Sequence, residues 1–291
     1  MLAEKTNFTI TRMVRLLEVS RSGYYAWAGR VPSRASLRRV HIEQKVAFFY
    51  GDSDETYGTP RILADLRADG EIISRKTVAA TMRRLGLVGI CPKKWKTTTI
   101  IDRADAYPVD AVKRKWDTGA LNQVWVGDIT YLRTWEGWVY LATVIDAHSR
   151  RVIGWAIADH IRTDLIEDAL RMALALRGDR PATVIFHSDR GTQYASEQIT
   201  LFAAKNGITR SMGYTGICWD NAMAESFFAT LKTEFYYRRV WPTRARAIQG
   251  VAEWIEDRYN RRRRHSAIGQ VTPVEFEMQY SSQAAQIQLA A

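Results

Sequence analysis

The chain has 291 residues, of which 46% are hydrophobic, and its formal net charge is +11. This length suits one large domain with smaller ones, and the composition suits a globular protein. Apolar runs are far shorter than the roughly 20 residues of a membrane span, and the N-terminus lacks the apolar core of a signal peptide. Cys91 and Cys218 are the only cysteines, which excludes a disulfide framework or a cysteine-based zinc site and favours a reducing cytoplasm.

The positive charge is concentrated towards the two ends of the chain. Residues 1–118 contain 22 Lys and Arg against 13 Asp and Glu, and residues 236–291 contain 9 against 5. Residues 119–235 contain 11 against 13. Basic flanks around a slightly acidic centre favour binding to DNA phosphates, with solubility charge on solvated faces as the alternative.

Residues 1–30 are predicted to form two short helices. Apolar residues recur at helical spacing after Ile10, and Ser20 is a suitable N-cap for the second helix. The apolar face of the first helix would comprise Met13, Val14, Leu16, Leu17 and Val19. The pair is helix–turn–helix-like, and a simple helical hairpin is the alternative.

A helix–turn–helix DNA-binding domain is predicted for residues 31–95, opening with a basic linker at residues 34–39. Thr59-Pro60 marks the start of one helix. Ser74 caps the next helix, and Gly86 follows its last turn. The buried stripe of that helix would consist of Val78, Met82 and Leu85. Its outward-facing residues, placed to approach DNA, would be Arg75, Lys76, Arg83 and Arg84.

No periodicity is visible in residues 96–120, which we interpret as a basic linker that tracks DNA. Residues 121–237 then alternate in the order three strands, helix, strand, helix, strand, helix. This order predicts a mixed sheet with helices on both faces. The expected strands are residues 123–132, 138–147, 151–158, 182–188 and 207–210, and the first two helices are residues 163–176 and 196–206.

Three acidic residues in this region suggest catalysis. Asp128 and Asp189 each end an apolar, strand-like run, and Glu225 opens an amphipathic helix. Carboxylates at the mouths of two buried strands, joined by a third on a helix, can hold two divalent metals that stabilise an in-line phosphoryl displacement. The alternatives are turn or cap roles for each aspartate.

Two other residues compete for a place in this site. Asp146 also ends an apolar run, but the His-Ser-Arg that follows predicts a turn, so we interpret Asp146 as a turn cap. His187 lies close to Asp189 in the sequence. Strand alternation favours packing or a supporting hydrogen bond for it over metal binding.

Five ordered motifs resemble those of the DDE transposases and retroviral integrases, and most closely the second reading-frame product of the IS3 family of bacterial insertion sequences. Together they cover roughly residues 9–277. The motifs are Trp125 to Tyr131, Val144 to Trp155, His187 to Tyr194, Cys218 to Ser226, and Tyr259 to His265 with Thr272-Pro273.

The resemblance implies an α/β fold: an RNase H-like catalytic core with a mixed five-stranded sheet, preceded by all-α helix–turn–helix segments. Asp128, Asp189 and Glu225 would be both catalytic residues and ligands of two Mg²⁺ or Mn²⁺ ions. Lys232, two helical turns after Glu225, would contact DNA near the cut. Residues 238–291 would form a basic C-terminal helix and tail, with phosphate contacts from Arg261, Arg263 and His265; a solvated helix end is the alternative.

The function that follows is metal-dependent cleavage at the ends of an insertion sequence, then strand transfer by the released 3′ hydroxyl. A nuclease that only hydrolyses, and a helix–turn–helix protein without activity, are the alternatives. The resemblance further implies a homo-oligomer on DNA, fusion to an upstream reading frame, and a bacterial cytoplasmic, nucleoid-associated protein without membrane contact. The sequence does not specify the terminal repeats, the target site or the number of subunits.

Overall fold

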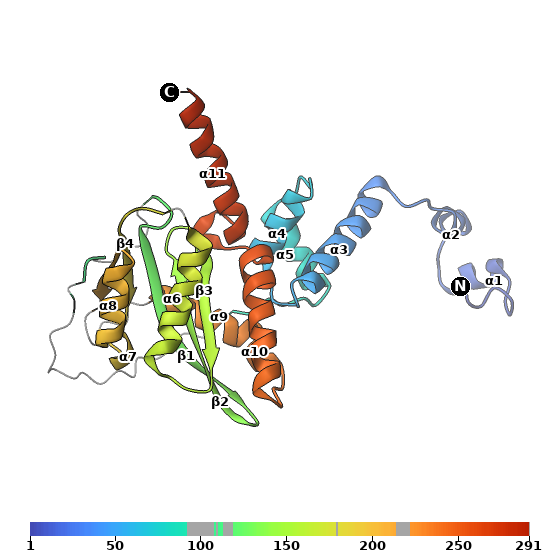
Figure 1. Ribbon diagram of the computed structural model, residues 1–291. Helices are drawn as coiled ribbons and strands as arrows, with labels where there is room; N and C mark the ends of the chain where they lie inside the picture. Colours follow the sequence, from blue (N-terminus) through green and yellow to red (C-terminus); the bar gives the residue numbers. More distant parts are fainter. Residues whose placement is uncertain (92–107, 109, 113–118, 179, 214–221, 291) are drawn as a thin grey trace.

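The computed structural model describes the chain except for residues 92–107, 109, 113–118, 179, 214–221 and 291 (Figure 1). Most of the expected linker, residues 96–120, therefore lies outside the described residues. Within it, Asp110 and Val112 are buried, and Val112 joins the core of the sheet.

Strands and helices follow the predicted order. The strands are β1 (Val124–Thr134), β2 (Gly137–Asp146), β3 (Val152–Ala158), β4 (Val184–Ser188) and β5 (Ile208–Met212). The N-terminal helices are α1 (Ile10–Leu16), α2 (Arg21–Ala28), α3 (Arg34–Asp52), α4 (Thr59–Ala68) and α5 (Arg75–Arg84). The helices of the core are α6 (Thr163–Arg177), α7 (Thr192–Ala195), α8 (Glu197–Lys205) and α9 (Ala222–Glu234). The later elements are η1 (Tyr236–Arg238), α10 (Arg244–Glu253), the π-helix η2 (Trp254–Arg262), η3 (Ser266–Ile268) and α11 (Pro273–Ala290).

The sheet has the order β3-β2-β1-β4-β5, so β1 is its central strand. β1, β2 and β3 form an antiparallel meander, and β4 and β5 continue the sheet parallel to β1. This is the predicted mixed five-stranded sheet. Because β1 and β4 are parallel and β4 is shorter, the end of β4 lies beside the middle of β1.

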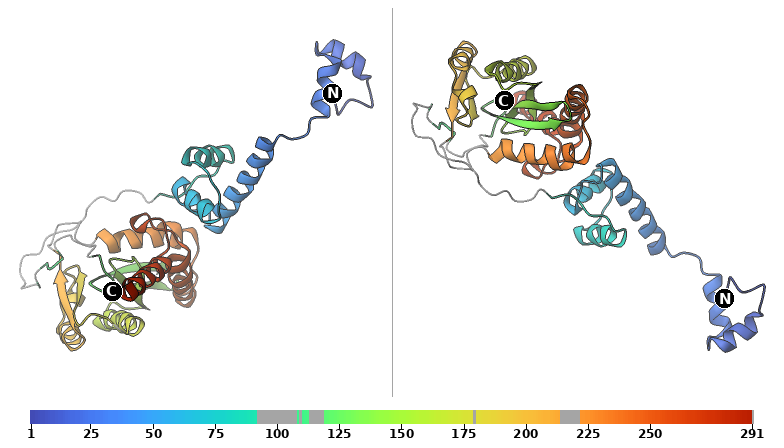
Figure 2. Two further views of the ribbon diagram at one scale, coloured as in Figure 1. Left: turned by 90° about the horizontal axis from the view of Figure 1, so that it is seen from above. Right: turned by 90° about the horizontal axis from the view of Figure 1, so that it is seen from below.

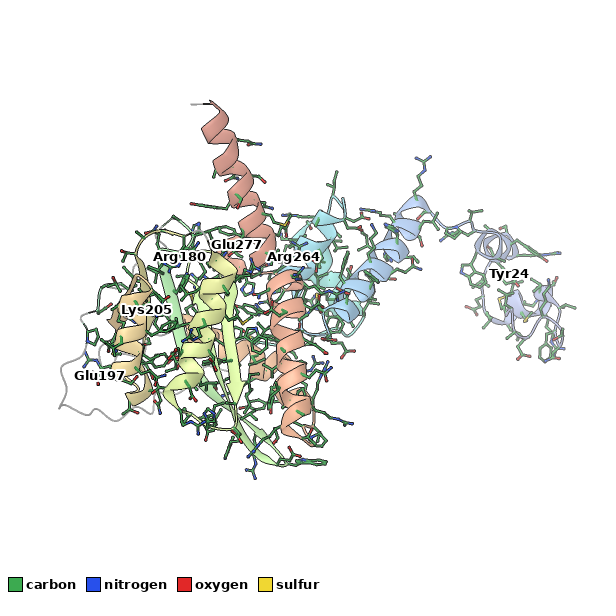
Figure 3. All side chains as sticks on the ribbon, viewed as in Figure 1. Tyr24, Arg180, Glu197, Lys205, Arg264 and Glu277 are labelled. Atoms are coloured by element: carbon green, nitrogen blue, oxygen red, sulfur yellow. The ribbon has the colours of Figure 1, made fainter. Side chains whose placement is uncertain are left out.

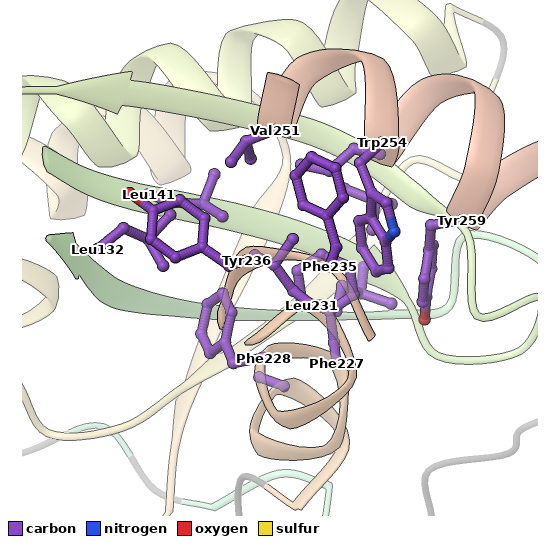
Figure 4. Packing of buried hydrophobic residues seen from close by; sticks show 14 of the residues in the cluster. Leu132, Leu141, Phe227, Phe228, Leu231, Phe235, Tyr236, Val251, Trp254 and Tyr259 are labelled. Atoms are coloured by element: carbon purple, nitrogen blue, oxygen red, sulfur yellow. The ribbon is translucent and has the colours of Figure 1, made fainter. Parts of the chain in front are cut away.

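Each face of the sheet carries its own helical layer. Trp125 and Val144 point into one core, which is closed by α6 and α8. Val124 and Val126 point into the other, which is closed by α9, α10 and η2 (Figure 4). Because Trp254 and Tyr259 of η2 belong to this second core, we place the end of the catalytic unit beyond residue 237, where the sequence suggested a boundary.

The α3–α5 unit has its own small core, which includes Ile62, Leu66 and Val78 (Figure 2). Residues 34–39 are not a linker, because Ser33 caps α3 and the basic stretch forms its first turns. Arg38 there pairs with Glu71 of the α4–α5 connection at 2.5 Å. This long-range ion pair makes the charged stretch part of the folded unit.

Two expected apolar faces are smaller than predicted. In α1 only Met13 and Val14 are buried, whereas Leu16, Leu17 and Val19 are exposed. In α5 the buried set is Val78, Thr81 and Met82, and Leu85 is exposed at the C-cap. Ser20 and Ser74 cap their helices as predicted.

Candidate active site

Asp128 lies midway along the central strand, on the face covered by α9. Val124 and Val126 point into the core beneath α9, and the two-residue period of a strand places Asp128 on the same side. The side chain is half-buried, and its Oδ1 accepts a hydrogen bond from the Ile129 N–H at 2.7 Å. Within the described residues, β4 pairs with β1 only up to Val126, so Asp128 lies just beyond the last pair between these strands.

Asp189 occupies the matching place on the neighbouring strand. Val126 pairs with His187 across the parallel ladder, and Asp128 and Asp189 each follow two residues later. Adjacent strands lie about 4.8 Å apart, so the two carboxylates are neighbours. Gly191 N–H donates to Asp189 Oδ1 at 3.0 Å, which fixes the turn that leaves β4. Asp189 therefore has both the turn role and the position near Asp128 that the sequence suggested for it.

The close approach of β1 and β4 depends on a glycine. A methyl group at Gly127 would lie 2.3 Å from the ring of Phe186, so no larger residue fits there without movement. Phe186 is buried, one strand away and three residues before Asp189. The glycine directly before Asp128 thus lets the two acid-bearing strands pack side by side.

Glu225 is brought to the site by α9. Phe227, Phe228 and Leu231 anchor this helix in the core on the Asp128 face (Figure 4). Glu225 lies in the first turn and is exposed. Lys232 follows seven residues later, on the same side of the helix.

Nearby positive charge does not balance the negative charges of the three acids. Burial, with added repulsion from Asp189 and Glu225, raises the pKa of Asp128 to about 8, although the Ile129 N–H and Lys232 oppose the shift. Loss of water also raises the pKa of Asp189 and of Glu225. The three acids are therefore close enough to interact, and the protein supplies too little positive charge to balance them.

A divalent cation fits this donor set. Carboxylates offer only oxygen acceptors, which hard cations prefer, and a bound cation would relieve the repulsion at Asp128. Within the described part of the chain, no three His, Cys, Asp or Glu side chains lie close enough together to hold one ion. The acids thus surround the site without converging on a single point.

The raised pKa of Asp128 predicts a pH-dependent stability. In the metal-free protein Asp128 holds its proton up to about pH 8. In the unfolded chain the same carboxyl ionises near pH 4. Unfolding therefore releases a proton between these values, and stability should fall as pH rises through this window, by up to about 1.4 kcal/mol per unit. Thermal melts of Asp128→Asn should show a higher Tm than wild type at pH 8 and little difference at pH 4. A wild-type advantage at pH 8 would contradict the assignment.

Lys232 is linked to both the acids and a neighbouring aromatic ring. Burial lowers the pKa of Lys232, and the negative charge of Asp128 opposes this shift. Its Nζ lies 5.1 Å from the centroid of the Tyr131 ring. The ammonium group therefore sits beside the acidic site.

Asp146 has a structural role, as predicted. It is fully buried, and Oδ1 accepts hydrogen bonds from the N–H groups of His148 and Ser149 at 2.9 and 3.2 Å. Oδ2 accepts from the Asn122 N–H at 2.9 Å. Arg177 lies 3.5 Å away and also binds Glu277 of α11 (Figure 3). Asp146 thus fastens the β2–β3 turn to neighbouring elements.

Asp146→Asn is expected to destabilise the fold without removing a catalytic group. An amide leaves one of the backbone donors and Arg177 poorly satisfied, at a cost of about 2 kcal/mol. A chemical-denaturation series should show this loss, with DNA cleavage per folded molecule unchanged. Inactivity at wild-type stability would make Asp146 a member of the catalytic set.

His187 supports the strand next to the site. It is buried, and its Nδ1 lies 2.9 Å from Ser211 Oγ on β5 and 3.8 Å from Asp110 Oδ1. Ser211 also accepts a hydrogen bond from the Ala111 N–H at 2.9 Å. These contacts attach the segment after residue 109 to the sheet, in agreement with the supporting hydrogen bond expected for His187.

The basic side chains of α5 face outward from the α3–α5 core. Arg75, Lys76 and Arg83 are exposed. Arg84 is also exposed, but its Nε binds Glu43 of α3 at 2.6 Å. Among the described residues no acid pairs with the first three of these charges, and the fourth is held by an internal acid.

Two models of the integrase core domain match residues 120–218 and 206–273, and a model of an HTH-like domain matches residues 38–95. The chain is 41% identical over 278 residues to the transposase InsF for insertion sequence IS3A of Escherichia coli K12, covering 94% of this chain and 95% of that protein. The chain belongs to the IS3 family of insertion-sequence transposases.

Further relatives extend this comparison. The uncharacterized 31 kDa protein of insertion element IS600 from Shigella sonnei is 37% identical over 276 residues, covering 94% of this chain and all of that protein (100%). The catalytic core domain of HTLV-2 integrase, solved in complex with magnesium, matches 53% of this chain and 95% of its own, with 16% identity and a TM-score of 0.42. As an IS3-family transposase, the protein is a DNA-acting enzyme with a DDE phosphoryl-transfer core. No helix in the described part is long and apolar enough to cross a membrane.

In this transposase Arg263 is not placed to contact DNA, and the expectation for it is corrected. Arg263 is 5% exposed and donates to both Glu234 oxygens at 2.7 Å, so its guanidinium is committed to this pair. Burial beside Arg263 and Arg61 lowers the pKa of His265 well below its ordinary value. The side chain of His265 is half-buried, and for it a phosphate contact stays a prediction. Arg261 is exposed, and for it a phosphate contact stays a prediction.

The same segment joins the helix–turn–helix domain to the catalytic core. Arg61 of α4 donates to the Arg264 carbonyl at 3.0 Å and lies 3.4 Å from Glu234 at the end of α9. Arg264 binds Asp65 of α4 at 2.5 Å, and Tyr57 OH accepts from its N–H at 2.8 Å. The helix that carries Glu225 is therefore attached at its far end to the DNA-binding domain.

Glu234→Gln is expected to destabilise this joint strongly, because it leaves Arg263 buried without its charge partner. Breaking one partner of a buried pair costs about 3–5 kcal/mol. Calorimetry should show a Tm several degrees lower, whereas Glu253→Gln, an exposed glutamate on α10, should change it little. Equal effects of the two substitutions would mean that the Glu234–Arg263 pair does not stabilise the fold.

The sequence interpretation missed Arg61 and Glu234. Each is an ordinary charged residue within a helical pattern, and their partners lie far away in the sequence. The available signal was an Arg-rich run across the end of the core helix Trp254–Arg262, because charges at a buried helix end must be paired.

Proposed function

We propose that Asp128, Asp189 and Glu225 hold two Mg²⁺ or Mn²⁺ ions and catalyse cleavage at the ends of the element, followed by transfer of the 3′ hydroxyl to target DNA. The observation that carries this proposal is that Asp128 and Asp189 each lie two residues beyond the paired Val126 and His187 of adjacent parallel strands, with Glu225 on the helix that covers Asp128. The pKa of about 8 for Asp128 marks the place where a cation is needed.

Each residue has a distinct task in this scheme. Asp128, on the central strand, lies nearest to both other acids and supplies oxygens between them. Asp189 and Glu225 supply the flanking oxygens, from a strand end and from a helix. When bound, the two ions stabilise the attacking and leaving oxygens of an in-line displacement.

Lys232 positions the DNA in this proposal. Its ammonium lies beside Asp128 and can bind a non-bridging phosphate oxygen of the strand being cut. The protein needs no covalent intermediate for this reaction, so no serine or tyrosine nucleophile is required. The exposed basic residues of α5 would hold DNA further from the reacting phosphate.

The wider assembly is also part of the proposal. We expect a homo-oligomer on DNA that brings element ends and target together, and an upstream-frame fusion partner for end recognition. The setting would be the bacterial cytoplasm, at the nucleoid. Family membership supports these points, since the alignment with the IS3A transposase spans nearly the whole chain.

The test is a joining assay with a duplex that carries the element's terminal repeat and a free 3′ hydroxyl. With the fused protein, joining to target DNA is expected in Mg²⁺ or Mn²⁺. Ca²⁺ should support binding but not joining, because its looser coordination misplaces the reacting oxygens. Hydrolysis of the same duplex without any joining would favour the nuclease alternative.

A further inference from the structure

Two large aromatic rings, one on the strand that carries Asp128 and one on its neighbour β2, are exposed to solvent. Tyr131 on β1 is 61% exposed and Trp138 on β2 is 42% exposed. Their ring centroids are 5.2 Å apart with an angle of 87° between the planes, so they form one edge-to-face pair. Aromatic side chains usually bury most of their large apolar area, and an exposed pair of this kind marks a contact surface.

Each ring of this pair carries a cation. Lys232 Nζ lies 5.1 Å from the Tyr131 centroid, and Arg133 Cζ lies 5.7 Å from the Trp138 centroid. The cross-strand pairing of Arg133 with Trp138 fixes the second contact within the β1–β2 hairpin. We call Tyr131, Trp138, Arg133 and Lys232 the aromatic platform.

The platform is linked to the active site by Lys232. Tyr131 follows Asp128 by three residues on the same strand, a distance of about 10 Å along an extended chain, and strand alternation directs its ring to the opposite face of the sheet. Lys232 connects the two places, because its charge acts on Asp128 and its ammonium covers the Tyr131 ring. Among the described residues, β4 does not pair with this part of β1, so the edge between them is open.

We propose that the aromatic platform stacks unpaired nucleotides of the DNA end whose phosphate reacts at Asp128, Asp189 and Glu225. The proposal rests on the proposed function, since it places the DNA by that site. Aromatic rings stack on the faces of unpaired bases, and interleaved Lys and Arg hold the adjoining phosphates. A duplex end would thus be opened next to the reacting bond.

The combination of aromatic rings and cations favours unpaired DNA over a protein as the ligand of the platform. A protein partner would favour a platform whose centre is depleted of charge. Here a cation lies over each ring, which leaves the positive charge at the surface for phosphate. The acids repel the DNA phosphates unless cations are bound. The cations of the platform attract the phosphates close to this acidic site.

Photo-crosslinking tests the contact without relying on catalysis. A duplex with the terminal repeat carries 5-iodouracil at each of its last positions in turn, and is bound to the fused protein in Ca²⁺. Iodouracil crosslinks to aromatic side chains on which it stacks. Peptide mapping should find the crosslink at Tyr131 or Trp138, and iodouracil in the duplex interior should not give it. Crosslinks to other residues alone, or none at any end position, would overturn the proposal.

Substitution of the rings supplies the second measurement. Tyr131→Ala and Trp138→Ala should lower joining of a fully paired end by about tenfold to a hundredfold, as expected for the loss of base stacking. Tyr131→Phe and Trp138→Phe should stay within about threefold of wild type. Tyr237→Ala removes a similarly exposed ring from η1 and should have no effect.

A pre-opened end separates stacking from a merely structural role. If the platform holds unpaired bases, mismatches at the terminal base pairs should restore much of the joining by the alanine variants. Full activity of both alanine variants on the paired end would overturn the proposal. A mapped crosslink in a protein that does not join DNA would support the platform and count against the proposed reaction, so the two failures are distinguishable.

Discussion

Asp128→Asn, Asp189→Asn and Glu225→Gln are each expected to lower DNA cleavage and joining by at least about a thousandfold. Each change removes one negative charge from the oxygen set that would hold the divalent ions. The ions contribute several kcal/mol to the transition state, and each 1.36 kcal/mol corresponds to a factor of ten in rate. Single-turnover assays on the terminal-repeat duplex in Mg²⁺ measure this loss.

DNA binding by the same three variants should remain within about twofold of wild type. The basic residues of α5 lie in a separate folded unit and do not touch these acids. Filter-binding or anisotropy titrations in Ca²⁺ provide the control. Metal-dependent cleavage that persists in one variant would remove that acid from the site, and a parallel loss of binding would point to misfolding.

Local signals in the sequence were sufficient to predict the order of the elements. Ser74 and Gly86 bound α5 because capping depends on groups within one helical turn. The strands of the core follow apolar runs separated by turns, which predicts strand positions but not neighbours in the sheet. Asp128 and Asp189 could be proposed together since both end such runs, and Glu225 since it opens the amphipathic helix that follows.

Contacts between distant residues could not be predicted in this way. Arg263 looked like a DNA contact in its basic run, and only the fold brings Glu234 to it. The basic stretch at residues 34–39 looked like a linker for the same reason, as Glu71 lies more than thirty residues away. A run of basic residues predicts an exposed surface only when the fold brings no buried acidic residue into contact with it.

The joint between α4 and the end of α9 relates the two halves of the transposase. The helix next to α5, α4, contacts Arg264 and Glu234, so DNA held at α5, as proposed, would be linked to the end of α9. Glu225 lies at the opposite end of the same α9. Loss of the contacts between α4 and the end of α9 should therefore affect the placement of Glu225 in addition to stability. In Glu234→Gln, the melting temperature reports stability and the cleavage rate per folded molecule reports the placement of Glu225.

Neutralising α5 is expected to weaken DNA binding by an amount that depends on salt. The triple variant Arg75→Gln, Lys76→Gln and Arg83→Gln removes the three exposed charges that no internal acid holds. Each lost phosphate contact should flatten the slope of log K against log salt by roughly one unit, because fewer counterions are released. Addition of Arg84→Gln should change the slope less, since Glu43 already binds Arg84 at 2.6 Å.

A matched control uses basic residues on the helical layers of the core. Lys205→Gln, Arg239→Gln and Arg246→Gln remove the same number of exposed charges, which no described acid pairs with, from α8, the C-cap of η1 and α10. If α5 lies against the DNA backbone, the α5 variant should show the flatter slope at equal net charge, and its cleavage rate at saturating DNA should be unchanged. Equal slopes for the two triple variants would show that binding follows net charge alone and that α5 does not touch the backbone.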